Sequence, residues 1–201
     1  MTLTRAVVQL CRVHADPATD PRARDNGMPA AEGRGSLGTV CALVLMLVAG
    51  FIGATELHDN SFLTHLATGR WIARGNFTRM WLGASDPYLW TSGSRTWVVQ
   101  SWLASSAYHG AERVGGVAGI RLLVAATCMA LTACLWRLSA PARTLVPRVV
   151  AVGFALAIGG SLWNERPLMF GLLFLALALL AADGGMRTVW LAPIGWLWVN
   201  T

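Results

Sequence analysis

The chain has 201 residues, of which 55% are hydrophobic and 13% are charged. Soluble domains carry about 25% charged residues, so the composition favours a membrane protein over a soluble one. The formal net charge is +6, and all of the basic side chains are arginines. Because these arginines mostly flank apolar runs, contact with lipid headgroups explains them better than a nucleic-acid partner, which we exclude.

Residues 1–36 form a tail rich in Arg, Asp, Pro, Gly and Ala. The stretch at 16–24 (DPATDPRAR) has no regular apolar face with which to pack on a core. Such a composition is typical of disorder, so we predict a disordered tail that precedes the folded part of the chain.

Apolar runs of membrane-spanning length follow the tail. A bilayer core about 30 Å thick needs roughly 20 apolar residues in a helix. We therefore predict an all-α polytopic membrane protein with about four to five transmembrane helices. The predicted spans are Leu37–Ala54, Val117–Trp136, Leu145–Trp163 and Leu168–Ala182, and a fifth apolar segment begins at Val189.

The first and last of these runs each leave an alternative. The run Leu37–Ala54 is either a cleavable signal peptide or an anchor, and its length favours an uncleaved anchor. The fifth run stops at Thr201, before a helix starting at Val189 could cross a bilayer. We therefore expect the chain to be the N-terminal part of a longer protein.

The distribution of arginines predicts the orientation of the spans in a bacterial inner membrane. The positive-inside rule assigns arginine-rich short connections to the cytoplasm. A cytoplasmic N-terminus puts the arginines of the tail and of the inner connections inside and leaves only Arg166 in the short turn Asn164–Pro167 on the outer side. Residues 56–116 are then an outer loop on the same side as that turn. The inner arginines include Arg22, Arg24, Arg34, Arg137, Arg143, Arg148 and Arg187.

The loop at residues 56–116 is polar and rich in tryptophan. Apolar residues at helical spacing predict helices at about 61–74 and 101–113, joined by an irregular segment. Both are too short and too polar to span, so we expect them to lie at the membrane interface. Ser61 is the predicted N-cap of the first helix, and Gly75-Asn76 is expected to end it. Asp86 before Pro87 is expected to start a turn, and Gly115-Gly116 is expected to end the second helix. Five tryptophans are expected to form an aromatic belt, namely Trp71, Trp81, Trp90, Trp97 and Trp102.

Polar residues directly after the first apolar run are the best candidates for chemistry. Glu56, His58 and Asp59 lie there, and a carboxylate in this place can act as a general base or hold a divalent cation that bridges to a phosphate. A carboxylate near another acid tends to have a raised pKa, which we expect for Asp59. The simpler alternative is that these are polar residues at a helix exit. Metal binding by His58, His65 and Asp59 matches no strong spacing motif.

Several short motifs in this region resemble a known family. They are D-x-x-x-x-x-H-L-x-T-G-R-W-I from Asp59 to Ile72, D-P at Asp86-Pro87, W-V-x-Q-S-W-L from Trp97 to Leu103, and R-P-x-x-F from Arg166 to Phe170. This pattern is similar to the first outer loop of bacterial polytopic membrane proteins related to the GT-C superfamily of glycosyltransferases. Members of that superfamily take sugars from polyprenyl-phosphate carriers.

The resemblance implies roles for individual residues. In GT-C families an acidic residue just after the first span serves as catalytic base or metal-linked group, and Asp59 matches that position. Members often carry a second acid at the position of Ser61 and an acid at that of Ser101, and this chain departs from the pattern at both. For the phosphate leaving group we expect Arg166, because a guanidinium pairs well with phosphate oxygens. Glu56, His58 and His65 complete the predicted substrate-binding set.

Two functions of different classes are consistent with the sequence. The first is a membrane glycosyltransferase-like protein that uses a lipid-linked sugar at the outer face, with a divalent cation as the one cofactor considered. As part of a longer protein, the 201-residue piece alone is then expected to be inactive. The second is a non-enzymatic polytopic membrane component, such as a transporter subunit or an assembly partner.

Overall fold

The computed structural model describes residues 31–55, 57, 59–86, 88, 96–142, 144–163, 165–184 and 188–201. The chain divides into two units, Met1–Arg34 and Gly35–Thr201. Of the first unit only residues 31–34 are described, and they begin a helix. The predicted disordered tail therefore lies almost wholly outside the described residues.

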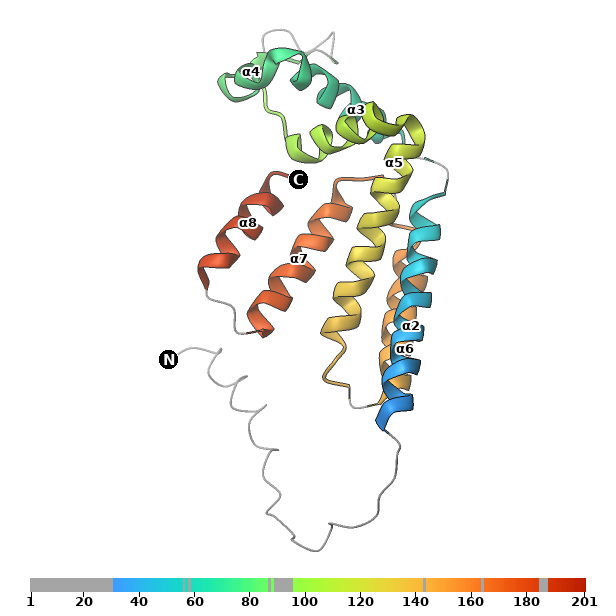
Figure 1. The fold of residues 1–201 in the computed structure, drawn as a ribbon. Helices are drawn as coiled ribbons and strands as arrows, with labels where there is room; N and C mark the ends of the chain where they lie inside the picture. Colours follow the sequence, from blue (N-terminus) through green and yellow to red (C-terminus); the bar gives the residue numbers. More distant parts are fainter. Residues whose placement is uncertain are drawn as a thin grey trace, which may run out of the picture. The chain divides into compact units, whose positions relative to one another are not determined.

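The protein is mostly helical, as the sequence predicts (Figure 1). A short antiparallel pair, in which Ala84 lies opposite Trp97, closes the segment that the sequence predicts to be irregular. The helices are α2 (Ala31–Gly53), α3 (Asn60–Trp71), the π-helical η1 (Ile72–Asn76), α4 (Phe77–Leu82), α5 (Trp102–Leu138), α6 (Leu145–Gly159), α7 (Leu168–Asp183), η2 (Thr188–Trp190) and α8 (Leu191–Val199), and the strands are β1 (Ala84–Ser85) and β2 (Thr96–Trp97).

Glycines break the helices where the sequence predicts breaks. Gly75 has φ +91° at the bend between α3 and α4. Within α5, Gly115 and Gly116 leave the helical conformation, and Gly116 has φ +59°, which favours glycine. The kink divides α5 into a short arm (residues 102–114) and a long arm (residues 117–138), which run in different directions (Figure 1).

Among the described residues, α5 is the one helix that is both long and apolar enough to cross a membrane. Its long arm extends about 33 Å at 1.5 Å per residue, against a bilayer core of about 30 Å. The helices α6 and α7 have 15 and 16 residues and reach only about 22 to 24 Å. The apolar part of α2, Leu37–Gly53, is also shorter than a full span requires. Helix lengths therefore do not establish the predicted four or five spans.

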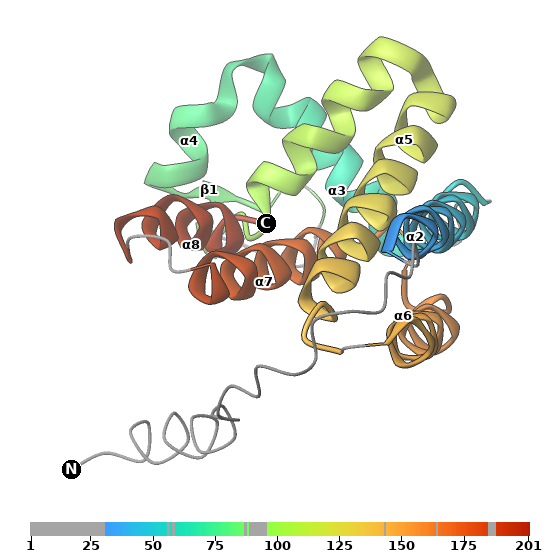
Figure 2. The same ribbon diagram turned by 60° about the horizontal axis from the view of Figure 1, so that its bottom comes forward.

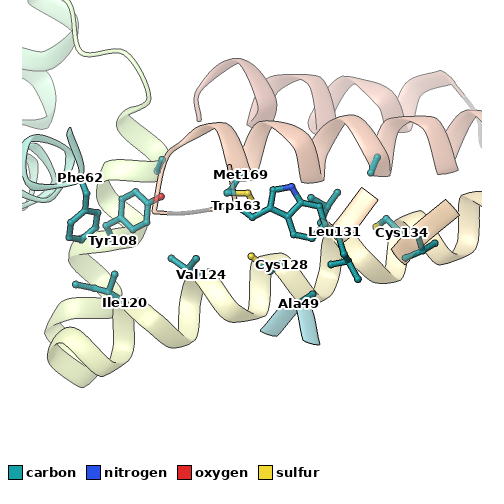
Figure 3. Packing of buried hydrophobic residues seen from close by; sticks show 14 of the residues in the cluster. Ala49, Phe62, Tyr108, Ile120, Val124, Cys128, Leu131, Cys134, Trp163 and Met169 are labelled. Carbon is teal, nitrogen blue, oxygen red and sulfur yellow. The ribbon is translucent and has the colours of Figure 1, made fainter. Parts of the chain in front are cut away.

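The long arm of α5 is the central element of the helical bundle. Figure 2 shows it between α7 on one side and the pair α2 and α6 on the other. Gly53 of α2 lies so close that a Cβ there would be 2.9 Å from the Cα of Ala125 in α5. Buried side chains from four segments follow this arm (Figure 3), namely Ala49, Ile120, Val124, Cys128, Leu131, Cys134, Trp163 and Met169.

The helices that surround α5 also carry large apolar side chains on their outer faces. In α2, Leu47 and Phe51 are 65% and 77% exposed. In α6, Val146 and Phe154 are 71% and 66% exposed, and in α7 Leu179 is 51% exposed. Such extensive apolar exposure is unusual on a soluble monomer and normal where lipid or a partner covers the surface.

The two predicted loop helices pack against each other across a glycine. A Cβ on Gly69 of α3 would meet the backbone carbonyl of Ser105 and lie 2.8 Å from the Cβ of His109, both in the short arm. We expect Gly69→Ala to lower the free energy of unfolding by about 1–3 kcal/mol, because the two backbones must separate. Thermal unfolding of the purified protein measures this. Gly110→Ala is the matched control, since a Cβ there meets nothing within 4 Å, and it should stabilise slightly.

Candidate functional site

Asp59 begins helix α3 and is its N-cap. Its backbone is extended (φ −89°, ψ 116°), and its Oδ1 accepts a hydrogen bond of 2.8 Å from the backbone N–H of Ser61. The sequence-based assignment of Ser61 as N-cap is therefore wrong by two residues. The acidic side chain at Asp59 satisfies one of the free N–H groups of the first turn and suits the positive end of the helix dipole.

Two residues of the turn before α7 contact Asp59. The guanidinium of Arg166 forms an ion pair with Oδ2 of Asp59. The backbone N–H of Asp59 donates a hydrogen bond of 2.6 Å to Oε1 of Glu165. Segments 106 residues apart in sequence thus meet at one end of the bundle, as the sequence predicts for the loop and the Asn164–Pro167 turn.

The three side chains differ in their access to solvent. The side chain of Asp59 is 6% exposed, whereas that of Arg166 is 54% exposed. Glu165 is 3% exposed and is the most deeply buried charged residue among the described ones. Arg166 therefore pairs with a shielded carboxylate while about half of its own side chain stays open to solvent.

The pKa of Asp59 is lowered, which corrects the expectation that it would be raised. Burial acts to raise this pKa, but hydrogen bonds from Ser61 and Arg166 and the positive charge of Arg166 together outweigh burial. Glu56, the neighbouring acid on which the expectation rested, lies outside the described residues, as does His58. Asp59 is therefore ionised at neutral pH.

His65 lies on α3 and faces the short arm of α5. Its Nδ1 is 3.2 Å from the hydroxyl oxygen of Ser105, which is fully buried. Burial lowers the pKa of His65, and the negative charge of Asp59 offsets this only in part. The imidazole is therefore neutral at pH 7 and close enough to Asp59 to sense its charge.

Tyr108, in the short arm of α5, was not predicted from the sequence and adjoins the same cluster. It is 1% exposed, and its ring meets Phe62 edge-on with centroids 5.1 Å apart. Its hydroxyl points toward the turn that leads into α7 (Figure 3). Burial raises the pKa of Tyr108, and the charges of Glu165 and Asp59 raise it further. The phenol therefore stays protonated and places an O–H group near two carboxylates.

A second ion pair holds α3 to the short arm of α5. Arg70 binds both carboxylate oxygens of Glu112, with an Nε–Oε2 distance of 2.9 Å. Nδ1 of His109 is 3.4 Å from the same carboxylate. Hydrogen bonding from Arg70 lowers the pKa of Glu112. This cluster joins the two helices, and each of its members already has a protein partner.

The described residues do not fit a divalent cation at Asp59. Oδ1 of Asp59 accepts from Ser61 and Oδ2 accepts from Arg166, so a positive group already occupies the place of a metal. Within the described ranges, no group of three or more His, Cys, Asp or Glu side chains is arranged to hold a metal ion. The remaining predicted ligand, His58, falls in a gap between those ranges.

Chemically, the cluster combines an ionised carboxylate with an accessible guanidinium. The carboxylate of Asp59 can accept a proton, and Arg166 can bind a phosphate through charge-assisted hydrogen bonds. Glu165 accepts from the backbone N–H of Asp59, and the buried ring of Tyr108 packs beside them between Phe62 and Phe170. Comparison of the chain with protein-family models, with curated proteins and with solved structures found no match.

Proposed function

We propose that the chain is a multi-pass protein of the bacterial inner membrane with its N-terminus in the cytoplasm. The apolar outer faces of α2, α6 and α7 support this proposal, because a lipid environment removes their cost of exposure to water. The long arm of α5 supports it by its length and its mean hydropathy. In this arrangement the end that carries Asp59 and Arg166 faces the outside.

Reporter fusions test this topology. We expect a reporter joined after Arg95 to be active in the periplasm, because the loop at 56–116 is assigned outside. A reporter joined after Arg143 is expected to be active in the cytoplasm, since this residue lies in the arginine-bearing connection between α5 and α6. Periplasmic activity at Arg143, or cytoplasmic activity at Arg95, contradicts the assigned orientation.

For the site itself we propose transfer of a sugar from a polyprenyl-phosphate carrier. The observation that carries this proposal is the pair formed by a shielded, ionised Asp59 and a half-exposed Arg166 at one end of an apolar bundle. A lipid-linked phosphate presents its charge at the membrane surface, where an arginine at the end of the bundle meets it. The sequence motifs that resemble GT-C glycosyltransferases place their functional acid at Asp59.

The proposed mechanism uses both members of the pair. The acceptor hydroxyl attacks the anomeric carbon of the sugar while Asp59 takes the hydroxyl proton, and the bond between that carbon and the phosphate oxygen breaks. The phosphate leaves with the bonding electrons, and Arg166 stabilises its charge. When Arg166 turns to the phosphate it releases Asp59, whose pKa then rises and makes it a stronger base. We further assign His65, with Glu56 and His58, to the binding of the substrate.

A non-enzymatic membrane component is the second candidate, and one observation favours it. Both carboxylate oxygens of Asp59 already have protein partners, as expected for a residue that only caps α3 and joins it to α7. Turnover of a lipid-linked sugar in membranes containing the full-length protein distinguishes the two candidates. Transfer supports the enzyme, whereas a well-inserted protein without transfer supports the component.

A further inference from the structure

The segment between α3 and α5 exposes a compact apolar surface that the transfer chemistry does not use. Its side chains come from α4 and from the residue after β2, and we call them the aromatic ledge. The ledge comprises Phe77 (48% exposed), Trp81 (60%), Leu82 (80%) and Val98 (71%). Behind it lies a hollow of about 200 Å³, lined mainly by Met80, Trp81, Trp97, Val99 and Trp102.

The tryptophans that the sequence predicts to form one belt differ in their exposure to solvent. Trp81 is exposed, whereas Trp71, Trp97 and Trp102 are partly buried. Trp71 and Trp97 meet edge-on at 5.3 Å. Trp90 lies outside the described residues. The partly buried rings support the ledge from behind, and Trp81 faces outward from it.

Trp102 joins the ledge to α8. Its ring meets Trp81 and Trp196 edge-on, each at 6.1 Å between centroids. Its indole Nε1–H donates to Oδ1 of Asn200 at 2.6 Å, and the backbone N–H of Leu103 donates to the carbonyl oxygen of Asn200 at 3.0 Å. Figures 1 and 2 place α4 on the side of α8 and away from α2 and α6.

Exposed apolar side chains therefore continue from the bundle onto the ledge. In the last turns of α8, Trp196, Trp198 and Val199 are 56%, 41% and 85% exposed. The ledge follows directly beyond them through Trp102. It thus lies where the apolar surface of the bundle ends, which is the level that tryptophan side chains prefer at a membrane interface.

The charge around the ledge matches an anionic membrane surface. Arg74 and Arg79 are exposed, and neither forms an ion pair with a carboxylate of the described residues. Residues 70–85 contain Arg70, Arg74 and Arg79 and no acidic residue. An aromatic face beside such arginines is the composition of a segment that lies in the headgroup region of anionic lipids.

We propose that the aromatic ledge docks into the headgroup region of an anionic phospholipid bilayer, with Phe77, Trp81, Leu82 and Val98 inserted and with Arg74 and Arg79 on the lipid phosphates. This proposal rests on the membrane location proposed above. It adds a second attachment of the protein to the bilayer, beyond the C-terminal end of the helix that Asp59 caps. The attachment holds α3, and with it Asp59, at a fixed height over the lipid surface.

Photocrosslinking tests the docking. The full-length protein, with benzoylphenylalanine in place of Leu82, is reconstituted in bilayers of equal parts phosphatidylglycerol and phosphatidylcholine and irradiated. We expect lipid adducts by mass spectrometry, enriched in phosphatidylglycerol. Arg74→Gln and Arg79→Gln should each reduce this enrichment by about five-fold at most, since one arginine near the surface contributes about that factor.

The same probe in place of Phe154, on the outer face of α6, is the control. Adducts at both positions support the ledge. Two results would contradict docking of the ledge but not the proposed membrane location. One is adducts at position 154 without adducts at position 82, and the other is crosslinks from position 82 to another protein. Absence of lipid adducts at both positions overturns the membrane location itself, and the ledge with it.

Discussion

Asp59→Asn should lower the rate of sugar transfer by about a hundred-fold to ten-thousand-fold, the usual effect of losing a general base. The amide cannot take the proton of an acceptor hydroxyl. Asparagine is also a good N-cap, so α3 and its contact with Ser61 should survive the change. We expect normal membrane insertion and a normal level of the full-length protein. Transfer from a radiolabelled lipid-linked sugar, measured in isolated membranes, gives the rate.

Asp86→Asn is the matched control for this change. The carboxylate of Asp86 accepts a hydrogen bond of 2.8 Å from the backbone N–H of Tyr88, which makes it a turn residue as the sequence predicts. An asparagine side chain can accept the same bond. We therefore expect close to normal transfer from Asp86→Asn. Near-normal turnover by Asp59→Asn would show that Asp59 acts only as a cap and a partner of Arg166.

Arg166→Met should have the second largest effect on sugar transfer, because it changes both the binding of the phosphate and the protonation of Asp59. It removes a charged hydrogen-bond donor for the phosphate, and such a bond contributes about 1.5–3 kcal/mol, or roughly ten- to a hundred-fold in kcat/KM. Arg166→Lys keeps the charge but not the paired geometry and should fall between methionine and the parent. Kinetics with a varied concentration of lipid-linked donor measure these effects. An unchanged kcat/KM for Arg166→Met would remove Arg166 from the phosphate site.

The pH dependence of stability provides an independent test of the pair. Because the folded-state pKa of Asp59 lies below its ordinary value of 3.8, the ion pair contributes stability above that value. This contribution is lost as the pH falls through the folded-state pKa. In Arg166→Met the folded-state pKa of Asp59 moves back toward its ordinary value, so less stability should be lost as the pH falls below 3.8 than in the parent. Thermal unfolding between about pH 2 and pH 7 measures the difference. The same loss of stability at low pH in the parent and in Arg166→Met would contradict the pairing.

Local patterns were enough to predict several parts of this structure. Gly75 and Gly116 mark real breaks because their positive φ angles favour a residue without a side chain. The turn at Asp86 follows from a side chain that bonds its own neighbouring backbone. Helical spacing of apolar residues located α3 and the short arm of α5. Each of these features is determined within a few residues of sequence.

The parts that were missed depend on contacts between distant segments. Glu165 looks like an ordinary turn residue, and only its hydrogen bond with the N–H of Asp59 gives its burial a reason. The N-cap is an exception, because Oδ1 of Asp59 accepts locally from the N–H of Ser61 while Arg166 binds the other carboxylate oxygen. The six-residue helix α4 is too short to leave a periodic signal. The position of Tyr108 depends on its packing against Phe62 and Phe170, which no local pattern indicates.

The most direct test of the proposed function is the fate of a lipid-linked sugar exposed to the parent protein. Membranes containing the full-length protein are incubated with a polyprenyl-phosphate sugar that is labelled in both the sugar and the lipid phosphate. We expect the sugar label to move to an acceptor hydroxyl while the phosphate label stays on the lipid, and we expect Asp59→Asn to stop this movement. Retention of both labels on the donor, by a protein that is inserted and folded, would contradict the proposed function.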